Sequence, residues 1–189
     1  APFPLCPFCA EEYQNSHNRR YHAQPVACPD CGPVLYGSTR KGITLMKEDA
    51  LGAATEVLQK GGLIALKGLG GFHLACDPCN SEVLERLRRH KKRQDKPFAL
   101  MAANLKEAEK LVFLNKREKK LLTSPQAPIL LCLARENRNI SPLVAPNQLR
   151  LGIMLPYTPL HILLLKSFCS LVMTSANYSG DPLITKNEE

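Results

Sequence analysis

The sequence predicts an α/β domain with a twisted, mostly parallel sheet and flanking helices, preceded by a small four-cysteine zinc-finger module. The first observation is that short apolar runs alternate with amphipathic stretches between residues 48 and 177, as in strands that alternate with helices. The second is a pair of Cys-x-x-Cys motifs within the first 31 residues. The third is that 189 residues with 44% hydrophobic content suffice for one core of ordinary size and a small module.

The two Cys-x-x-Cys motifs are Cys6/Cys9 and Cys28/Cys31. Such a pair of motifs is typical of a tetrahedral zinc site, because each turn places two thiolates at bonding distance from one metal ion. Gly32 gives the second turn backbone freedom. A redox motif of the thioredoxin type needs a strand before it, and "APFPL" is a poor strand. We therefore expect a closed, structural Zn²⁺ site rather than redox chemistry or a disulfide framework.

Three residues between the two cysteine pairs could act on the metal site. Arg19 and Arg20 are candidate charge partners for a metal site that carries net negative charge. His22 could itself be a ligand, since Cys₃His sites are common. With four cysteines already in register, we expect it around the site or on the surface.

The other four cysteines are expected to be free thiols. Cys76 and Cys79 form a third Cys-x-x-Cys motif, but no fourth pair completes a second site. Cys132 and Cys169 stand in apolar runs and are interpreted as small buried side chains.

Hydrophobic periodicity and capping residues place the elements of the α/β domain. We expect a finger module in residues 1–40 and the domain in residues 41–189, with the boundary near residues 37–44. Ser81, Asn104 and Thr158 are the expected N-caps of three helices. The helices are expected at 48–62, 81–93, 104–114, 115–124 and from Pro159, and the strands at 63–68, 96–102, 128–134 and 170–177.

Three polar segments are expected at strand ends, where parallel sheets bind ligands. Residues 67–77 contain three glycines that allow close backbone approach, and residues 174–180 are rich in hydroxyl and amide groups. Residues 86–96 hold seven Lys or Arg against one Asp. This basic segment attracts the phosphates of a nucleotide or a nucleic acid, although a solvated helix face is the alternative. Together the three segments suit a nucleoside-triphosphate site.

Several longer motifs follow one another in fixed order: "HAQPVACPDCGP", "LKGLGGFHLACD", "KKRQDKPFALM", "SPQAPILL", "LGIMLPYTPLHILLL" and "MTSANYSGDPL". In this order they resemble the HypF family of hydrogenase maturation proteins, over its second zinc-finger motif and most of its YrdC-like domain. The resemblance implies a carbamoyltransferase that joins carbamate, derived from carbamoyl phosphate, to ATP with Mg²⁺. The product, carbamoyl-adenylate, would supply a carbamoyl group to the partner protein HypE for synthesis of cyanide ligands.

The same resemblance implies roles for individual residues. The K-x-R motif of YrdC-like domains falls on Lys91 and Arg93, which are the implied catalytic residues. The S-x-N motif falls on Ser175 and Asn177. The full set of implied substrate- or nucleotide-binding residues is Lys67, His73, Lys96, Ser175 and Asn177.

The resemblance also implies that further domains of the family lie outside these 189 residues. The acylphosphatase domain, the first zinc-finger motif and the transferase domain are not represented, and the YrdC-like domain is expected to be truncated at its C-terminus. We therefore do not expect this fragment to complete the reaction by itself. The start "APFPLC" lacks the features of a signal peptide, and no apolar run could span a bilayer, so we expect a cytoplasmic protein with no membrane partner.

Two other functions would require different sequence features. A threonylcarbamoyl-adenylate synthase for tRNA modification would have "P-T-x-T-x-Y-G-L" where this chain has "KGLGGFHL", and it would lack the fused finger. A zinc-containing nucleic-acid-binding module would interleave aromatic residues with the basic segment, which has none. We do not expect nucleic acid as a partner.

Overall fold

The computed structural model describes residues 4–39, 41–177 and 180–187. The chain divides into two compact units, Ala1–Ala50 and Leu51–Glu189. The expected boundary, near residues 37–44, falls on a hairpin of the first unit. Each unit is described below by itself.

The described part of the first unit contains one complete helix, one small hairpin and the start of a second helix. Helix α1 (Pro7–Gln14) begins directly after Cys6, and Pro7 supplies the fixed backbone angle that suits a first helical residue. Strands β1 (Tyr36–Ser38) and β2 (Thr44–Met46) pair antiparallel. The buried apolar side chains described in this unit are Cys9, Val26 and Ala50. So small a core cannot stabilise a fold of this size well, which favours an additional cross-link such as a metal ion.

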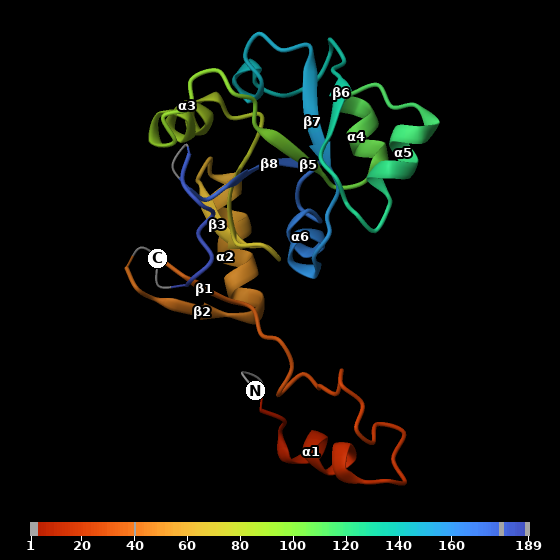
Figure 1. The fold of residues 1–189 in the computed structure, drawn as a ribbon. Coiled ribbons are helices and arrows are strands. Elements are labelled where there is room, and N and C mark those ends of the chain that lie inside the picture. Colours follow the sequence, from red (N-terminus) through yellow and green to blue (C-terminus); the bar gives the residue numbers. More distant parts are fainter. Residues whose placement is uncertain (1–3, 40, 178–179, 188–189) are drawn as a thin grey trace. The chain divides into compact units, whose positions relative to one another are not determined.

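The second unit is built on a six-stranded sheet in the order β3-β4-β8-β5-β7-β6 (Figure 1). Its strands are β3 (Ile64–Lys67), β4 (Phe72–Cys76), β5 (Ala99–Ala102), β6 (Leu130–Leu133), β7 (Arg150–Met154) and β8 (Ser170–Ser175). The helices are α2 (Lys47–Gln59), which begins in the first unit, α3 (Ser81–His90), α4 (Leu105–Leu111), α5 (Lys116–Leu122), the 3₁₀ turn η1 (Pro142–Val144) and α6 (Pro159–Leu164). The predicted α/β class is confirmed.

The sheet is mixed, and this corrects the expectation that it would be mostly parallel. Among its neighbouring strands, β5 and β7 are parallel and the other four pairs are antiparallel. A tight turn at residues 68–71 joins β3 and β4 as a hairpin, which fixes them antiparallel. Helix α3 connects β4 and β5, which run in the same direction, but β8 lies between them and runs against both. A helical crossover therefore joins parallel strands that are not neighbours.

Two strands of the six-stranded sheet, β4 and β7, are not predicted by the sequence, and neither are the short strands β1 and β2 of the first unit. Strand β4 falls in the segment 67–77, for which the sequence predicts a glycine-rich loop because Gly70 and Gly71 stand directly before the strand. Strand β7 has a glycine at its centre, which is unusual inside a strand. A Cβ atom on Gly152 would lie 3.2 Å from Cγ2 of Ile129, so this glycine lets the neighbouring β6 segment approach closely.

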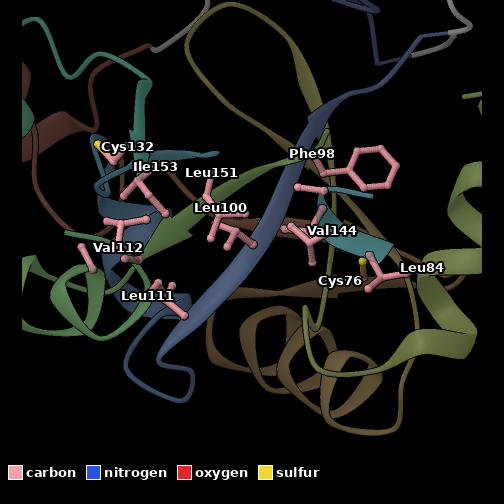
Figure 2. Packing of buried hydrophobic residues seen from close by; sticks show 14 of the residues in the cluster. Cys76, Leu84, Phe98, Leu100, Leu111, Val112, Cys132, Val144, Leu151 and Ile153 are labelled. Atoms are coloured by element: carbon pink, nitrogen blue, oxygen red, sulfur yellow. The ribbon is translucent and has the colours of Figure 1, made fainter. Parts of the chain in front are cut away.

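Helices cover both faces of the sheet in two apolar layers. The larger layer joins the inner faces of α3, α4 and α5 to the sheet, and Figure 2 shows Leu100 and Leu151 at its centre, with Cys132 on one side and Leu84 on the other. The second layer packs α2 and α6 against the opposite face, where Leu58 and Leu164 are fully or almost fully buried. Each buried leucine of this kind contributes about 1.5–3 kcal/mol through the hydrophobic effect.

The helix caps follow the predicted chemistry with one shift. Asn104 and Thr158 cap α4 and α6 as predicted, each accepting a hydrogen bond from a first-turn amide. The cap of α3 is Asn80 rather than Ser81, because Asn80 Oδ1 accepts the bond from the Val83 amide at 3.1 Å. The hydroxyl of Ser81 instead lies 2.8 Å from that of Ser141 in the loop leading to η1.

The eight cysteines are all free thiols in this structure. Cys132 is buried as predicted, but Cys169 is exposed, because the turn before β8 leaves it outside the apolar layers. Cys79 is also exposed, and its Sγ donates to the Asn139 carbonyl at 3.0 Å. In the described part of the chain, no helix combines the length and the apolar character that a bilayer crossing requires.

Candidate functional site

The four predicted metal ligands meet in the first unit. The sulfur atoms of Cys6, Cys9, Cys28 and Cys31 all lie within 4.8 Å of one another. The Sγ atom of Cys28 is 3.7 Å from that of Cys6 and 3.8 Å from that of Cys31. Four sulfurs bound tetrahedrally to zinc at about 2.3 Å would be separated by about 3.8 Å. The spacing of these four thiols therefore fits one Zn²⁺ ion.

Short backbone turns hold the sulfurs in place. The Cys9 amide lies 3.5 Å from the Sγ of Cys6, and the Asp30 amide lies 3.4 Å from the Sγ of Cys28. A Cβ atom at Gly32 would lie 2.7 Å from the Cys28 carbonyl oxygen, so only glycine allows the hydrogen bond that closes the second turn. Burial raises the pKa of the Cys9 thiol, whereas backbone hydrogen bonds from Cys6 and Cys28 lower the pKa of Cys31 to about 6.

The residues between the cysteine pairs do not enter this cluster. His22 is exposed, and its ring stacks on those of Tyr13 and Tyr21 at centroid distances of 5.0 and 4.2 Å. Arg20 forms an ion pair with Glu12 at 2.6 Å. The surface position expected for His22 is therefore confirmed, and in the described part of the chain the candidate metal cluster consists of the four cysteines.

A second candidate site is a cavity of about 820 Å³ in the second unit. All three polar segments selected from the sequence contribute to its wall. Its polar and charged lining residues are His73, Arg93, Lys96, Gln126, Tyr157, Thr174 and Ser175.

The antiparallel course of β8 explains how the segments meet. The end of β8 lies beside the start of β4, where Ser175 pairs with His73, and beside the start of β5, where Met173 pairs with Ala99. The basic segment therefore enters the site at the amino end of β5. The prediction of a mostly parallel sheet places the basic segment at the carboxyl end of a strand instead.

The side chain of Lys91 forms hydrogen bonds with the segment that carries the S-x-N motif, Ser175 and Asn177. Lys91 is 4% exposed, and Nζ donates to the Ser175 carbonyl at 2.6 Å, the Asn177 carbonyl at 2.7 Å and Asn177 Oδ1 at 3.2 Å. The Ser175 hydroxyl donates to the same Oδ1 at 2.6 Å. Burial, together with the positive charge of Arg93, lowers the pKa of Lys91. The three predicted residues thus form one network, in which three acceptors surround the ammonium group.

Arg93 and Lys96 place positive charge on the cavity wall. Arg93 donates to the Lys96 carbonyl at 3.1 Å, to the Thr174 hydroxyl at 3.3 Å and to the Pro97 carbonyl. Its guanidinium carbon lies 4.9 Å from the centre of the Phe98 ring, within the range of a cation–π contact. Burial and the nearby Arg88 lower the pKa of Arg93. A cation that is already desolvated and fixed in direction is well suited to hold an anionic group.

Two histidines lie close to each other at the cavity: His73 lines it, and His161 is not among the lining residues. His161 is completely buried and His73 is partly buried, with ring centroids 6.3 Å apart, and Tyr157 contacts His161 edge-on at 4.6 Å. Neither nitrogen of His161, nor Nδ1 of His73, has a hydrogen-bond partner among the described residues. Burial lowers the pKa of both imidazoles, that of His161 to about 4. Both rings are therefore neutral near pH 7.

Lys67 lies outside the cavity wall. Its ammonium group donates to Asn187 Oδ1 at 2.7 Å and lies 5.3 Å above the ring of Phe72. Asn177 is also not among the lining residues, and its Nδ2 donates to the Asp181 carbonyl at 2.7 Å. The structure therefore brings four of the predicted residues together on the cavity wall: His73, Arg93, Lys96 and Ser175. Lys91 and Asn177 are not lining residues, but both form hydrogen bonds with Ser175.

The apolar half of the cavity was not predicted. It includes Ile129 and Leu131 from the β6 segment, Gly152 and Met154 from β7, and Met173 from β8. One signal was present: residues 129–133 are apolar without alternation, as in a strand whose two faces both contact apolar groups. One face of β6 packs on the core, and the other forms the cavity wall.

Comparison with known proteins agrees with this arrangement. The Sua5_yciO_yrdC family, described as "Telomere recombination", matches residues 56–189, and the family described as "HypF finger" matches residues 5–36. The matched ranges define a four-cysteine finger followed by an α/β domain. The chain belongs to the Sua5/YciO/YrdC family.

The particular relatives are HypF proteins, as the sequence resemblance predicted. Carbamoyltransferase HypF of Rhodobacter capsulatus is 47% identical over 100% of this chain and 25% of its own length. A crystal structure of full-length HypF in the phosphate- and nucleotide-bound form is 38% identical, with a TM-score of 0.85 over 100% of this chain and 24% of that one. The chain thus spans about a quarter of these two proteins. Sua5 of P. abyssi complexed with L-threonine, 19% identical with a TM-score of 0.67 over 76% of this chain and 43% of that one, shares the fold.

Proposed function

We propose that this chain is part of a cytoplasmic carbamoyltransferase for hydrogenase maturation, and that its second unit binds ATP and forms carbamoyl-adenylate. The observation that carries the proposal is that Arg93, Lys96 and Ser175 lie on one cavity wall. The ammonium group of Lys91 donates a hydrogen bond to the Ser175 carbonyl and so holds this residue in place. A HypF relative of known structure was obtained in a phosphate- and nucleotide-bound form. The proposed substrates are ATP and carbamate derived from carbamoyl phosphate, and the proposed acceptor protein is HypE.

In the proposed reaction, a carbamate oxygen bonds to the α-phosphorus of ATP while the bond from that phosphorus to the bridging oxygen breaks. Pyrophosphate leaves with the electron pair of the broken bond, so negative charge grows on its oxygens. Arg93 and Lys96 supply positive charge and hydrogen-bond donors for these oxygens. Mg²⁺ bound with ATP would neutralise part of the same charge.

Lys91 and the S-x-N loop have a positioning part in this proposal. The ammonium group of Lys91 orients the main chain at Ser175 and Asn177 through two carbonyl contacts. Its charge also lies close to the wall that receives the phosphates. The neutral His73 faces the same cavity and can donate or accept a hydrogen bond without adding charge.

The zinc ion proposed for the first unit has a structural role. Its four cysteine ligands leave no coordination position for a substrate, so the ion would stabilise the fold of the finger.

Titration calorimetry of ATP with Mg²⁺ into the chain tests nucleotide binding. Saturable binding by the wild type, weakened in Arg93→Ala but not in the exposed Arg86→Ala, is the expected result. A chain that binds no nucleotide would contradict the proposal.

A second assay separates the two chemistries of the fold. In the longer carbamoyltransferase, exchange of labelled pyrophosphate into ATP should depend on carbamoyl phosphate. Threonine with bicarbonate should not replace it, because a pocket built for a small acid excludes a larger one. Exchange driven by threonine and bicarbonate, with none from carbamoyl phosphate, would favour threonylcarbamoyl-adenylate synthesis instead.

A further inference from the structure

Arg88, near the end of α3, is the arginine of the basic segment with the least exposed residue surface. The residue is 8% exposed, although its neighbour Arg89 is exposed. No ion pair of Arg88 is found in residues 4–39, 41–177 and 180–187, and burial lowers its pKa. A charge in such a place is costly unless dipoles surround it.

Backbone carbonyls provide those dipoles. The Arg88 Nη1 atom donates to the carbonyls of Arg93 at 2.9 Å, Gln94 at 2.8 Å and, more weakly, Lys96 at 3.4 Å. On the other side, Nε donates to the Leu143 carbonyl at 2.8 Å. The guanidinium therefore joins the loop that carries Arg93 and Lys96 to the 3₁₀ turn η1.

The ring of Phe98 completes this arrangement. The guanidinium carbons of Arg88 and Arg93 lie 4.7 and 4.9 Å from its centre, and the Phe98 amide donates to the Val144 carbonyl at 2.9 Å. The ring is 1% exposed, so it forms a rigid base against which both cations are placed. The loop between α3 and β5 is thus fixed by side chains on both sides of it.

We propose that Arg88 is a positioning residue for the phosphate-binding wall, which it serves without touching the nucleotide. This inference rests on the proposed function, because the wall that it orders is the proposed ATP site. Removing the guanidinium leaves the carbonyls of Arg93, Gln94 and Leu143 without the donor that they have in the described part of the chain, and the loop then loses the geometry that directs Arg93 and Lys96 into the cavity.

Lysine should be a poor substitute at this position. A guanidinium presents five N–H groups in a fixed plane, whereas an ammonium group is a compact charge on a flexible stem. An Arg88→Lys protein keeps the charge and most of the packing, but it cannot reach carbonyls on both sides at once. This variant separates the geometric role of Arg88 from its charge.

The first measurement needs no ligand. Hydrogen–deuterium exchange of the wild-type chain, Arg88→Lys, Arg88→Ala and the control Arg89→Ala is followed by mass spectrometry. Exchange in residues 92–98 should rise at least tenfold in both Arg88 variants, while the strands of the sheet keep their protection and Arg89→Ala resembles the wild type. Unchanged exchange in residues 92–98 would overturn the proposal.

The second measurement compares ATP with adenosine in the presence of Mg²⁺. Arg88→Lys should bind ATP at least tenfold more weakly than Arg89→Ala and adenosine with less than a twofold change, because the lost contacts concern phosphates. Millimolar guanidinium should restore part of the ATP affinity of Arg88→Ala. Equal losses for ATP and adenosine would show general damage and overturn the proposal, and Arg88→Lys supplies the test if Arg88→Ala does not fold.

The two proposals fail in different ways. If wild type and Arg89→Ala bind no ATP, the proposed function is wrong, and Arg88 has no phosphate wall to position even where exchange rises. If both bind ATP and Arg88→Lys binds it equally well, the function stands and the role of Arg88 is refuted.

Discussion

Protonation of His161 should make the stability of the second unit depend on pH. The imidazole is fully buried in α6, and the titratable side chains that face it are His73 from β4 and Tyr157 from the loop before α6. Burial, and to a smaller extent the charge of a protonated His73, lowers its pKa to about 4, against 6.5 for a free imidazole. The unfolded chain therefore takes up a proton at higher pH than the folded chain does.

The difference between the two pKa values determines the direction and the size of the change in stability with pH. The stabilising contribution is complete above pH 6.5 and is lost progressively as the pH falls from 6.5 through 4, the pKa of the folded state. Integration between pH 7 and pH 5 gives a loss of about 2 kcal/mol in the free energy of unfolding from this one residue. The His161→Phe variant keeps an aromatic ring at this position and cannot take up the proton.

Urea titrations followed by far-UV circular dichroism at both pH values measure this contribution. The wild type should lose about 2 kcal/mol more than His161→Phe on going from pH 7 to pH 5. The control is His90→Phe, because His90 is exposed at the end of α3 and this variant should follow the wild type. Parallel losses in wild type and His161→Phe would refute the reasoning.

Three further predictions follow from the two sites. Protein purified without chelator should contain one zinc ion per chain, and Cys31→Ser should lose this ion, because three thiolates leave the tetrahedral ligand set incomplete. Metal analysis checks both expectations, and wild-type protein without zinc would contradict them. Lys91→Ala and Arg93→Ala should each weaken ATP binding by about 1–3 kcal/mol in calorimetry, whereas Arg86→Ala should have little effect. Equal losses in all three would indicate diffuse electrostatics. Gly68→Ala should lower the free energy of unfolding by about 1–3 kcal/mol, because the added Cβ would lie 2.8 Å from the ring of His73. Urea titration measures this loss, and an unchanged unfolding midpoint would refute the prediction.

The α/β class could be predicted because local patterns determine it. Helical spacing and capping side chains identified α4 and α6 with their caps, Asn104 and Thr158. Strand pairing depends on contacts between distant segments, and here the last strand, β8, enters between β4 and β5. No local sequence pattern in residues 72–102 indicates that a strand from the end of the chain lies between β4 and β5. The antiparallel pairing of these strands therefore could not be predicted from their sequence.

The prediction of the candidate site was uneven for a similar reason. The four cysteines could be chosen from spacing alone, because Cys-x-x-Cys motifs bring their own turns. Lys91, Ser175 and Asn177 were selected through the resemblance to a family, and their hydrogen-bonded network confirms only that they lie together. Their catalytic and binding roles stay predictions. Lys67 shows the limit of this approach, since it stands in the selected segment but not on the cavity wall.

The basic segment illustrates how helix periodicity divides residues of the same charge into different roles. Positions 84, 87, 88 and 91 follow the spacing of one helix face, and the leucines at the first two are fully buried. The same face therefore carries Arg88 and Lys91 inward, while Arg86 and Arg89 turn to solvent. A solvated helix face, the alternative weighed for the whole segment, describes only the outward residues. The two inward cations, Arg88 and Lys91, donate hydrogen bonds to backbone carbonyls of the segments that carry the lining residues Arg93 and Ser175. The position of a residue around the helix axis therefore decides, more than the local charge density, whether it helps to build the site.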